Sequence, residues 1–177
     1  MRTFIALELP TAFADEAAGM ARVLSASVEG RFLGRDTYHV TLAFLGDITE
    51  AYATQAMDAV DEACEGANPV PLIPDGLGKF GRAADATLWL GLAKTEPLMS
   101  LAESLREGLR SRGLPFDDKA FLPHITLARR ARLPKGALPQ LAFPLPASAP
   151  AITLFKSTLD REGAVYKPLY SRELPDA

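Results

Sequence analysis

The chain contains only two histidines, and both lie in the same short sequence pattern. Residues 39–43 read His-Val-Thr-Leu-Ala, and residues 124–128 read His-Ile-Thr-Leu-Ala. Either histidine alone is most simply explained as a polar strand residue that is hydrogen-bonded to a backbone carbonyl. The same five-residue pattern at both histidines instead indicates that His39 and His124 share a function.

The alternation of side chains along a β-strand gives this repeated pattern a chemical meaning. Successive side chains of a strand point to opposite faces, so His39 and Thr41 share one face, as do His124 and Thr126. The apolar residues between them face the other way and suit packing beneath a helix. Two such strands placed opposite each other would form a groove lined by two imidazoles and two hydroxyls.

Two imidazoles and two hydroxyls suit phosphoryl chemistry near neutral pH. A neutral histidine can accept a proton from a nucleophile, while a charged one donates a proton to the leaving oxygen. Threonine hydroxyls can donate hydrogen bonds to the non-bridging oxygens of a phosphate. Two histidines on separate strands, with no cysteine cluster nearby, make a poor zinc site, so we expect no metal ion.

The sequence around both motifs resembles a known family over nearly the whole chain. The matching segments are residues 2–7, 39–47, 76–80, 88–91, 121–129 and 157–159, with Gly163 and Tyr166. They resemble the 2H phosphoesterases, and among these the RNA 2′,3′-cyclic phosphodiesterases, also called LigT-like proteins or 2′-5′ RNA ligases. One departure precedes the first motif: residues 31–35 read Arg-Phe-Leu-Gly-Arg where the family often has a tryptophan and a proline.

The resemblance implies an α+β fold with two pseudo-symmetric lobes and an active-site groove between them. Each lobe would be a mainly antiparallel β-sheet with helices outside, and residues 1–177 would form a single two-lobed domain. The implied reaction is hydrolysis of an RNA 2′,3′-cyclic phosphate end to a 2′-phosphomonoester, with 2′-5′ ligation as the reverse type of reaction. The resemblance makes His39 the proton donor and His124 the proton acceptor, whereas the residues alone leave these roles interchangeable.

Three further residues are candidate substrate contacts. Thr41 and Thr126 share the faces of their histidines, and Arg130 has the same strand parity as His124. If the strand continues that far, the guanidinium of Arg130 would contact the phosphate. Arg129 has the opposite parity and is expected to be structural, although the family resemblance keeps it a candidate.

Two other features are assigned no role in the site. Residues 76–81, Gly-Leu-Gly-Lys-Phe-Gly, match a dinucleotide-binding pattern, but a strand rather than a helix is expected to follow them. We therefore predict a turn there. Phe44 lies on the apolar face of its predicted strand, and Trp89 lies in an apolar strand, so both are predicted to belong to the core.

Strands and helices that alternate along the chain must position these residues. The order of strands and helices is doubled, with one histidine-bearing strand in each half. Residues 133–150 contain too many prolines for a helix or a central strand, so we expect a loop with an edge segment there. The expected strands cover 2–9, 38–45, 87–92, 121–129, 151–159 and 165–174, and the expected helices cover 12–27, 49–65 and 97–111.

The composition excludes several classes of protein. The chain has 177 residues, 48% of them hydrophobic, a formal net charge of -3 and one cysteine, which argues against disorder and disulfide scaffolds. We expect a cytoplasmic monomer that binds the terminal nucleotides of RNA. We expect it to use no cofactor and to bind no membrane. Two alternatives stay open: a non-catalytic module that binds phosphorylated RNA ends, or a phosphodiesterase for another cyclic phosphate or a 2′-5′ linked oligonucleotide.

Overall fold

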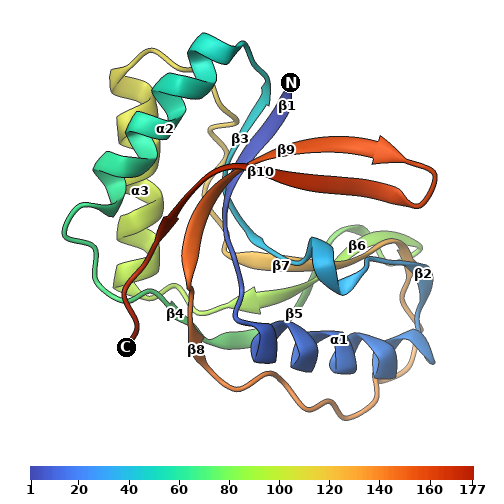
Figure 1. The fold of residues 1–177 in the computed structure, drawn as a ribbon. Coiled ribbons are helices and arrows are strands. Elements are labelled where there is room, and N and C mark those ends of the chain that lie inside the picture. Colours follow the sequence, from blue (N-terminus) through green and yellow to red (C-terminus); the bar gives the residue numbers. More distant parts are fainter.

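A computed structural model describes residues 1–177, which fold into two antiparallel sheets with three α-helices around them (Figure 1). The helices are α1 Thr11–Ser25, α2 Glu50–Cys64 and α3 Glu96–Ser111, with one 3-10 turn, η1 Arg35–Thr37. The strands are β1 Arg2–Leu7, β2 Glu29–Phe32, β3 Val40–Asp47, β4 Pro71–Leu72, β5 Pro74–Arg82, β6 Asp85–Leu92, β7 His124–Arg132, β8 Ala147–Ser148, β9 Ala151–Asp160 and β10 Gly163–Glu173.

The strands form two four-stranded sheets and one short pair. Sheet A has the order β10-β9-β1-β3, sheet B has the order β2-β7-β6-β5, and β4 pairs with β8. Helices α2 and α3 pack together against sheet A, while α1 lies along sheet B (Figure 1). One continuous cluster of 37 buried hydrophobic residues includes residues of both sheets. The expected α+β fold, with antiparallel sheets and helices outside them, is confirmed.

The two lobes are not successive halves of the chain. Strand β1 lies in sheet A, β2 in sheet B and β3 in sheet A again, and the chain returns to sheet A for β9 and β10. The doubled order of elements therefore predicted the two histidine strands correctly but not how the other strands are shared. Sheet A combines both ends of the chain, because β1 pairs with β3 on one side and with β9 on the other.

Local sequence signals explain where two of the helices begin. The hydroxyl of Thr49 accepts a hydrogen bond of 3.1 Å from the backbone N–H of Tyr52, and so caps α2. Thr95 caps α3 in the same way through Leu98, with Pro97 in the first turn. None of the three helices is long and apolar enough to cross a bilayer.

The glycine-rich segment at residues 76–81 is part of strand β5, so the prediction of a turn was wrong. Gly78 pairs with Trp89 of β6, and a Cβ atom built on Gly78 would lie only 2.1 Å from the indole ring. The glycine therefore lets the indole lie directly against the backbone of β5. This packing, rather than a phosphate-binding loop, accounts for a glycine at this position.

Candidate active site

The two histidines come from different sheets but lie in equivalent local structures. His39 directly precedes β3 of sheet A, His124 begins β7 of sheet B, and these two strands are in contact. His39 Nδ1 lies 2.7 Å from the carbonyl oxygen of Thr37, and His124 Nδ1 lies 2.6 Å from that of Leu122. Because a carbonyl only accepts, each Nδ1 must carry the hydrogen, which leaves Nε2 as the proton-accepting atom of the neutral ring.

Both motifs contain a β-bulge at the same place. In β3 one extra residue separates Thr41 from Ala43 relative to β1, and in β7 one extra residue separates Thr126 from Ala128 relative to β6. A bulge interrupts the alternation of faces, so side chains beyond it change sides. The fifth residue after each histidine is thereby brought to the face that carries the histidine.

That fifth residue is Phe44 in β3 and Arg129 in β7. Phe44 is 44% exposed and its ring contacts Phe4, with 5.8 Å between centroids, so the prediction that Phe44 belongs to the core was wrong. Arg129 lies close enough to His39 for its charge to act on the imidazole. The bulge explains both differences, because strict alternation would have turned each side chain away.

The alternation of side chains along β7, which was expected to place Arg130 on the face of His124, is also interrupted. Arg130 has a φ of 52°, and β7 carries a second irregularity at this point relative to β6. Its guanidinium is paired with Asp85, with 3.1 Å between Nη1 and Oδ2. Arg130 still lines the cavity described below, but Arg129 is the arginine that reaches toward the histidines.

Aromatic rings surround His39. The imidazole stacks on Phe4 with 4.7 Å between centroids, and meets Tyr166 edge-on at 5.3 Å. Burial lowers the pKa of His39 to about 4, and the electrostatic effects of His124 and Arg129 lower it further. The hydrogen bond to the Thr37 carbonyl acts in the opposite direction. His39 Nε2 also lies 2.9 Å from the Thr41 hydroxyl, so the structure brings this expected pair together.

His124 has a different aromatic neighbourhood in sheet B. Its ring meets Phe80 edge-on at 5.2 Å and lies 5.6 Å from the ring of Trp89. Trp89 pairs directly with Thr126 across the strands, so the tryptophan borders the motif instead of lying only in the core as predicted. Gly78, by admitting the indole, thus shapes the wall beside His124.

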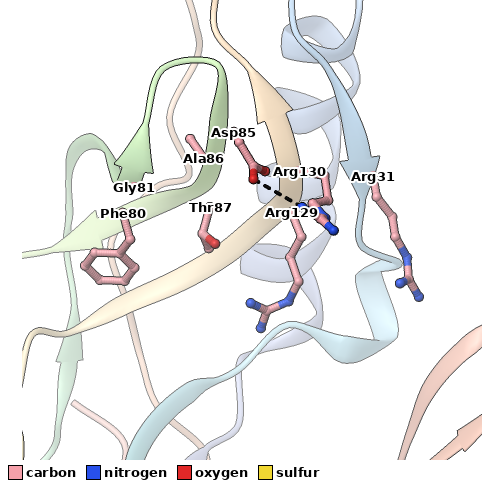
Figure 2. Close-up of a pocket in the computed structure, with 8 residues that line it drawn as sticks. All are labelled: Arg31, Phe80, Gly81, Asp85, Ala86, Thr87, Arg129 and Arg130. Atoms are coloured by element: carbon pink, nitrogen blue, oxygen red, sulfur yellow. Dashed lines mark hydrogen bonds and ion pairs between the residues drawn. The ribbon is translucent and has the colours of Figure 1, made fainter.

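A cavity of about 450 Å³ lies at the end of sheet B, next to Arg129. Figure 2 shows that Arg129 and Thr87 project into the same space, with Arg31 on the neighbouring strand. Arg31 of β2 and Arg129 of β7 are direct cross-strand partners. The residues that line the cavity are Arg31, Phe80, Gly81, Asp85, Ala86, Thr87, Arg129 and Arg130.

Arg106 links the two motifs from behind. This side chain of α3 is only 9% exposed. Its Nε donates to the carbonyl of Leu42, the extra residue of the β3 bulge, at 3.0 Å, and its Nη1 donates to the carbonyl of Lys119 at 2.7 Å. Lys119 lies in the loop that leads to His124, so one buried guanidinium holds the backbone of the first motif and of the loop before the second.

Sequence reasoning missed Arg106, Arg31 and Phe4 as neighbours of the site, whereas Tyr166 belonged to the segments that carry the family resemblance. Nothing in the local sequence marks the first two, because their placement depends on which strands pair. The exposed Phe44 and the inward Arg129 had a usable signal. The repeated pattern ends at Ala43 and Ala128, so the residues that follow, Phe44 and Arg129, hold equivalent places.

Two antiparallel sheets that each carry one His-x-Thr motif, on strands that contact each other, have the architecture of a two-histidine phosphoesterase. The chain belongs to the 2′-5′ RNA ligase superfamily, whose family model matches residues 10–161. The family resemblance read from the sequence is therefore confirmed.

Relatives with a stated activity match most of the chain. An RNA 2′,3′-cyclic phosphodiesterase of Thermotoga maritima is 28% identical over 176 residues, which cover 96% of this chain and 94% of that protein. The RNA 2′,3′-cyclic phosphodiesterase of Escherichia coli is also 28% identical, over 95% of this chain and 93% of that protein. The crystal structure of E. coli LigT complexed with 3′-AMP has a TM-score of 0.80 at 28% identity, and covers 98% of this chain and 97% of that chain.

Proposed function

We propose that this protein hydrolyses 2′,3′-cyclic phosphate ends of RNA to 2′-phosphomonoesters by general acid–base catalysis between His39 and His124. The observation that carries the proposal is the matched pair of histidines. They come from two different sheets, and each is held by a bond from Nδ1 to a carbonyl, so Nε2 is the atom that can transfer a proton. In the free protein the Thr41 hydroxyl donates to Nε2 of His39, and the substrate would replace it there. The activity of the relatives from T. maritima and E. coli supports the same substrate class.

The proposed reaction is an in-line displacement at phosphorus. His124 Nε2 accepts a proton from water while the water oxygen forms a bond to phosphorus. The bond from phosphorus to the ribose 3′-oxygen breaks, and His39 Nε2 donates a proton to that oxygen. The phosphate remains on the 2′-oxygen, and a second proton transfer returns both histidines to their starting states. No covalent intermediate with the protein is needed, and none of these steps uses a metal ion.

Three side chains would stabilise the charge that develops on the non-bridging oxygens. Thr41 and Thr126 can donate hydrogen bonds from their hydroxyls, each two residues after its histidine. Arg129 offers a guanidinium whose geometry suits two phosphate oxygens at once. Arg130, the original candidate for this contact, is paired with Asp85 and is assigned no direct part in it.

The low pKa of His39 places a condition on its role as the acid. With a pKa of about 4, His39 is mostly neutral at pH 7 in the free protein. A cyclic phosphate carries a negative charge, and an opposite charge within a few ångströms raises the pKa of a histidine. Binding of the substrate would therefore supply the electrostatic support that burial removes, and would protonate His39 when the leaving oxygen is in place.

The same geometry accommodates 2′-5′ ligation. A 5′-hydroxyl of a second RNA would replace water as the nucleophile, and His124 would accept its proton. The same bond from phosphorus to the 3′-oxygen breaks, and a 2′-5′ phosphodiester is formed. Hydrolysis is favoured in water because water is present at far higher concentration than any RNA end.

The test uses a short RNA that ends in a 2′,3′-cyclic phosphate, incubated with the protein and excess EDTA. We expect phosphorus NMR to show a 2′-phosphomonoester with the wild type and no product with His39→Ala or His124→Ala. Thr54→Ala, a change on the exposed side of α2, serves as the matched control and should keep full activity. Binding of the RNA without any product would instead support the binding-module alternative.

A further inference from the structure

The cavity at the end of sheet B contains more positive charge than one cyclic phosphate requires. Three arginines line it, namely Arg31, Arg129 and Arg130 (Figure 2). Only Arg130 has a carboxylate partner there, Asp85. The guanidinium groups of Arg31 and Arg129 take part in no hydrogen bond or ion pair within the protein. Two unpaired guanidiniums beside one cavity attract anionic ligands, and phosphate in particular.

The two unpaired arginines lie on different strands of sheet B. Arg129 follows His124 and Thr126 along the same strand, and its charge reaches His39. Arg31 lies opposite Arg129 but on β2, one strand further from the centre of sheet B. Figure 2 shows that the two side chains diverge from their strands, so their guanidiniums can contact two successive phosphates better than one. Arg129 thus serves the reacting phosphate, and Arg31 is left for a second one.

The other sheet supports the position of Arg31. Gly163 lies at the start of β10, in the hairpin that joins β9 to β10, and has a φ of 126°. A Cβ atom at this position would lie 2.7 Å from Nη2 of Arg31, so the guanidinium rests directly against the hairpin of sheet A. Arg31 therefore spans the groove at this end, and a ligand that enters the cavity meets groups from both sheets.

We propose that Arg31 binds the phosphodiester on the 5′ side of the terminal nucleotide, so that the site selects the ends of polynucleotides over free cyclic mononucleotides. This inference rests on the proposed function, because it needs the cyclic phosphate to be held between the histidines. Phe80, which is 43% exposed and also lines the cavity, offers an aromatic face beside that phosphate for the preceding base.

Three substrates separate this inference from the proposed function. Adenosine 2′,3′-cyclic phosphate has no 5′-phosphate, its 5′-phosphorylated form has one, and the dinucleotide ApA with a 2′,3′-cyclic end has a phosphodiester at that place. A charge-assisted hydrogen bond contributes enough for about a tenfold effect. We therefore expect the wild type to have a kcat/KM roughly tenfold higher for the second and third substrates than for the first.

Arg31→Gln should reduce that preference to about one, and Arg31→Lys should keep part of it, because lysine retains the charge without the planar fork. Arg31 is exposed, so neither change removes packing from the core. Arg132→Gln is the matched control: Arg132 is an exposed arginine of β7 outside the lining of the cavity, and its loss should leave the preference intact.

The possible results distinguish the two claims. Equal kcat/KM for the three substrates in the wild type would overturn the role of Arg31 and leave the proposed function standing. The same conclusion would follow if Arg31→Gln and Arg132→Gln lowered the preference equally, since that would indicate only a diffuse field. Absence of turnover on all three substrates would overturn the proposed function, and with it this inference.

Discussion

The two histidine motifs share backbone structure but not surroundings. In both, Nδ1 binds the carbonyl two residues earlier and a bulge follows the threonine. In sheet A, however, His39 stacks on Phe4, and the fifth residue after it is Phe44. In sheet B the corresponding residue is Arg129. The repeated part thus fixes the direction of Nε2, and the differing part places a phenylalanine after the motif of sheet A and an arginine after the motif of sheet B.

The proposed mechanism requires one motif to provide both an acid and a base, and the different surroundings offer a reason. Identical imidazoles acquire different properties only from their neighbours, and burial among aromatic rings lowers the pKa of His39 to about 4. The charge that restores its proton must then come from the substrate. In the proposed mechanism the acid and base roles would therefore be set in the complex with the phosphate rather than by either strand alone.

The largest expected effect follows removal of either histidine. His39→Ala and His124→Ala should each lower the single-turnover rate on a cyclic-phosphate RNA by roughly a thousandfold. The double variant should be little slower than either single one, because acid and base act on one transition state. A loss of less than tenfold in one single variant would show that its histidine transfers no proton in the rate-limiting step.

A second test concerns the buried imidazole of sheet A. The pKa of His39 in the folded protein, about 4, lies below its unfolded value of about 6.5. The unfolded chain therefore binds the proton more readily, so stability is complete above pH 6.5 and is lost as the pH falls toward 4, by about 3 kcal/mol.

Urea unfolding at several pH values between 7 and 4 measures this loss. His39→Gln should lose less stability over the same range, whereas the carboxylates contribute equally to both proteins. Parallel stability curves for the wild type and the variant would contradict the low pKa.

The third prediction compares neighbouring arginines of β7. Arg129→Gln should lower kcat/KM by about a hundredfold, because a donor to the developing phosphate charge is removed. Arg130→Gln, which breaks only an exposed ion pair with Asp85, should change kcat/KM by less than about threefold. Steady-state kinetics on one RNA substrate suffices, and the reverse ranking would restore the assignment made from strand alternation.

The smallest effect concerns the aromatic counterpart of Arg129. Phe44→Ala should raise KM by about tenfold, since stacking on a base contributes about 1–3 kcal/mol. Phe44→Tyr keeps the ring and should behave like the wild type. If both variants had the same KM, Phe44 would lie outside the nucleotide site.

The sequence was sufficient for the features that depend on local pattern. The family, the histidine pair, the capped start of α2 and the closing hairpin of β9 and β10 all follow from short segments. The bulges themselves did not, because a bulge is defined by the pairing with the partner strand. The match between the two motifs indicates that Phe44 and Arg129 hold equivalent places, but not to which face they point. Arg106 was missed for the same reason, since its two carbonyl partners are distant in sequence.

The position of β1 between β3 and β9 has a consequence for how the protein is made. On the ribosome, β1 and β3 emerge early, but the strand that completes sheet A arrives only after most of the chain has been synthesised. Until then β1 has one unpaired edge, which exposes nascent chains to edge-to-edge aggregation. The aromatic wall of His39 closes last, when Tyr166 reaches Phe4. Catalytic competence should therefore appear late and abruptly during synthesis, rather than in proportion to the length of chain already translated.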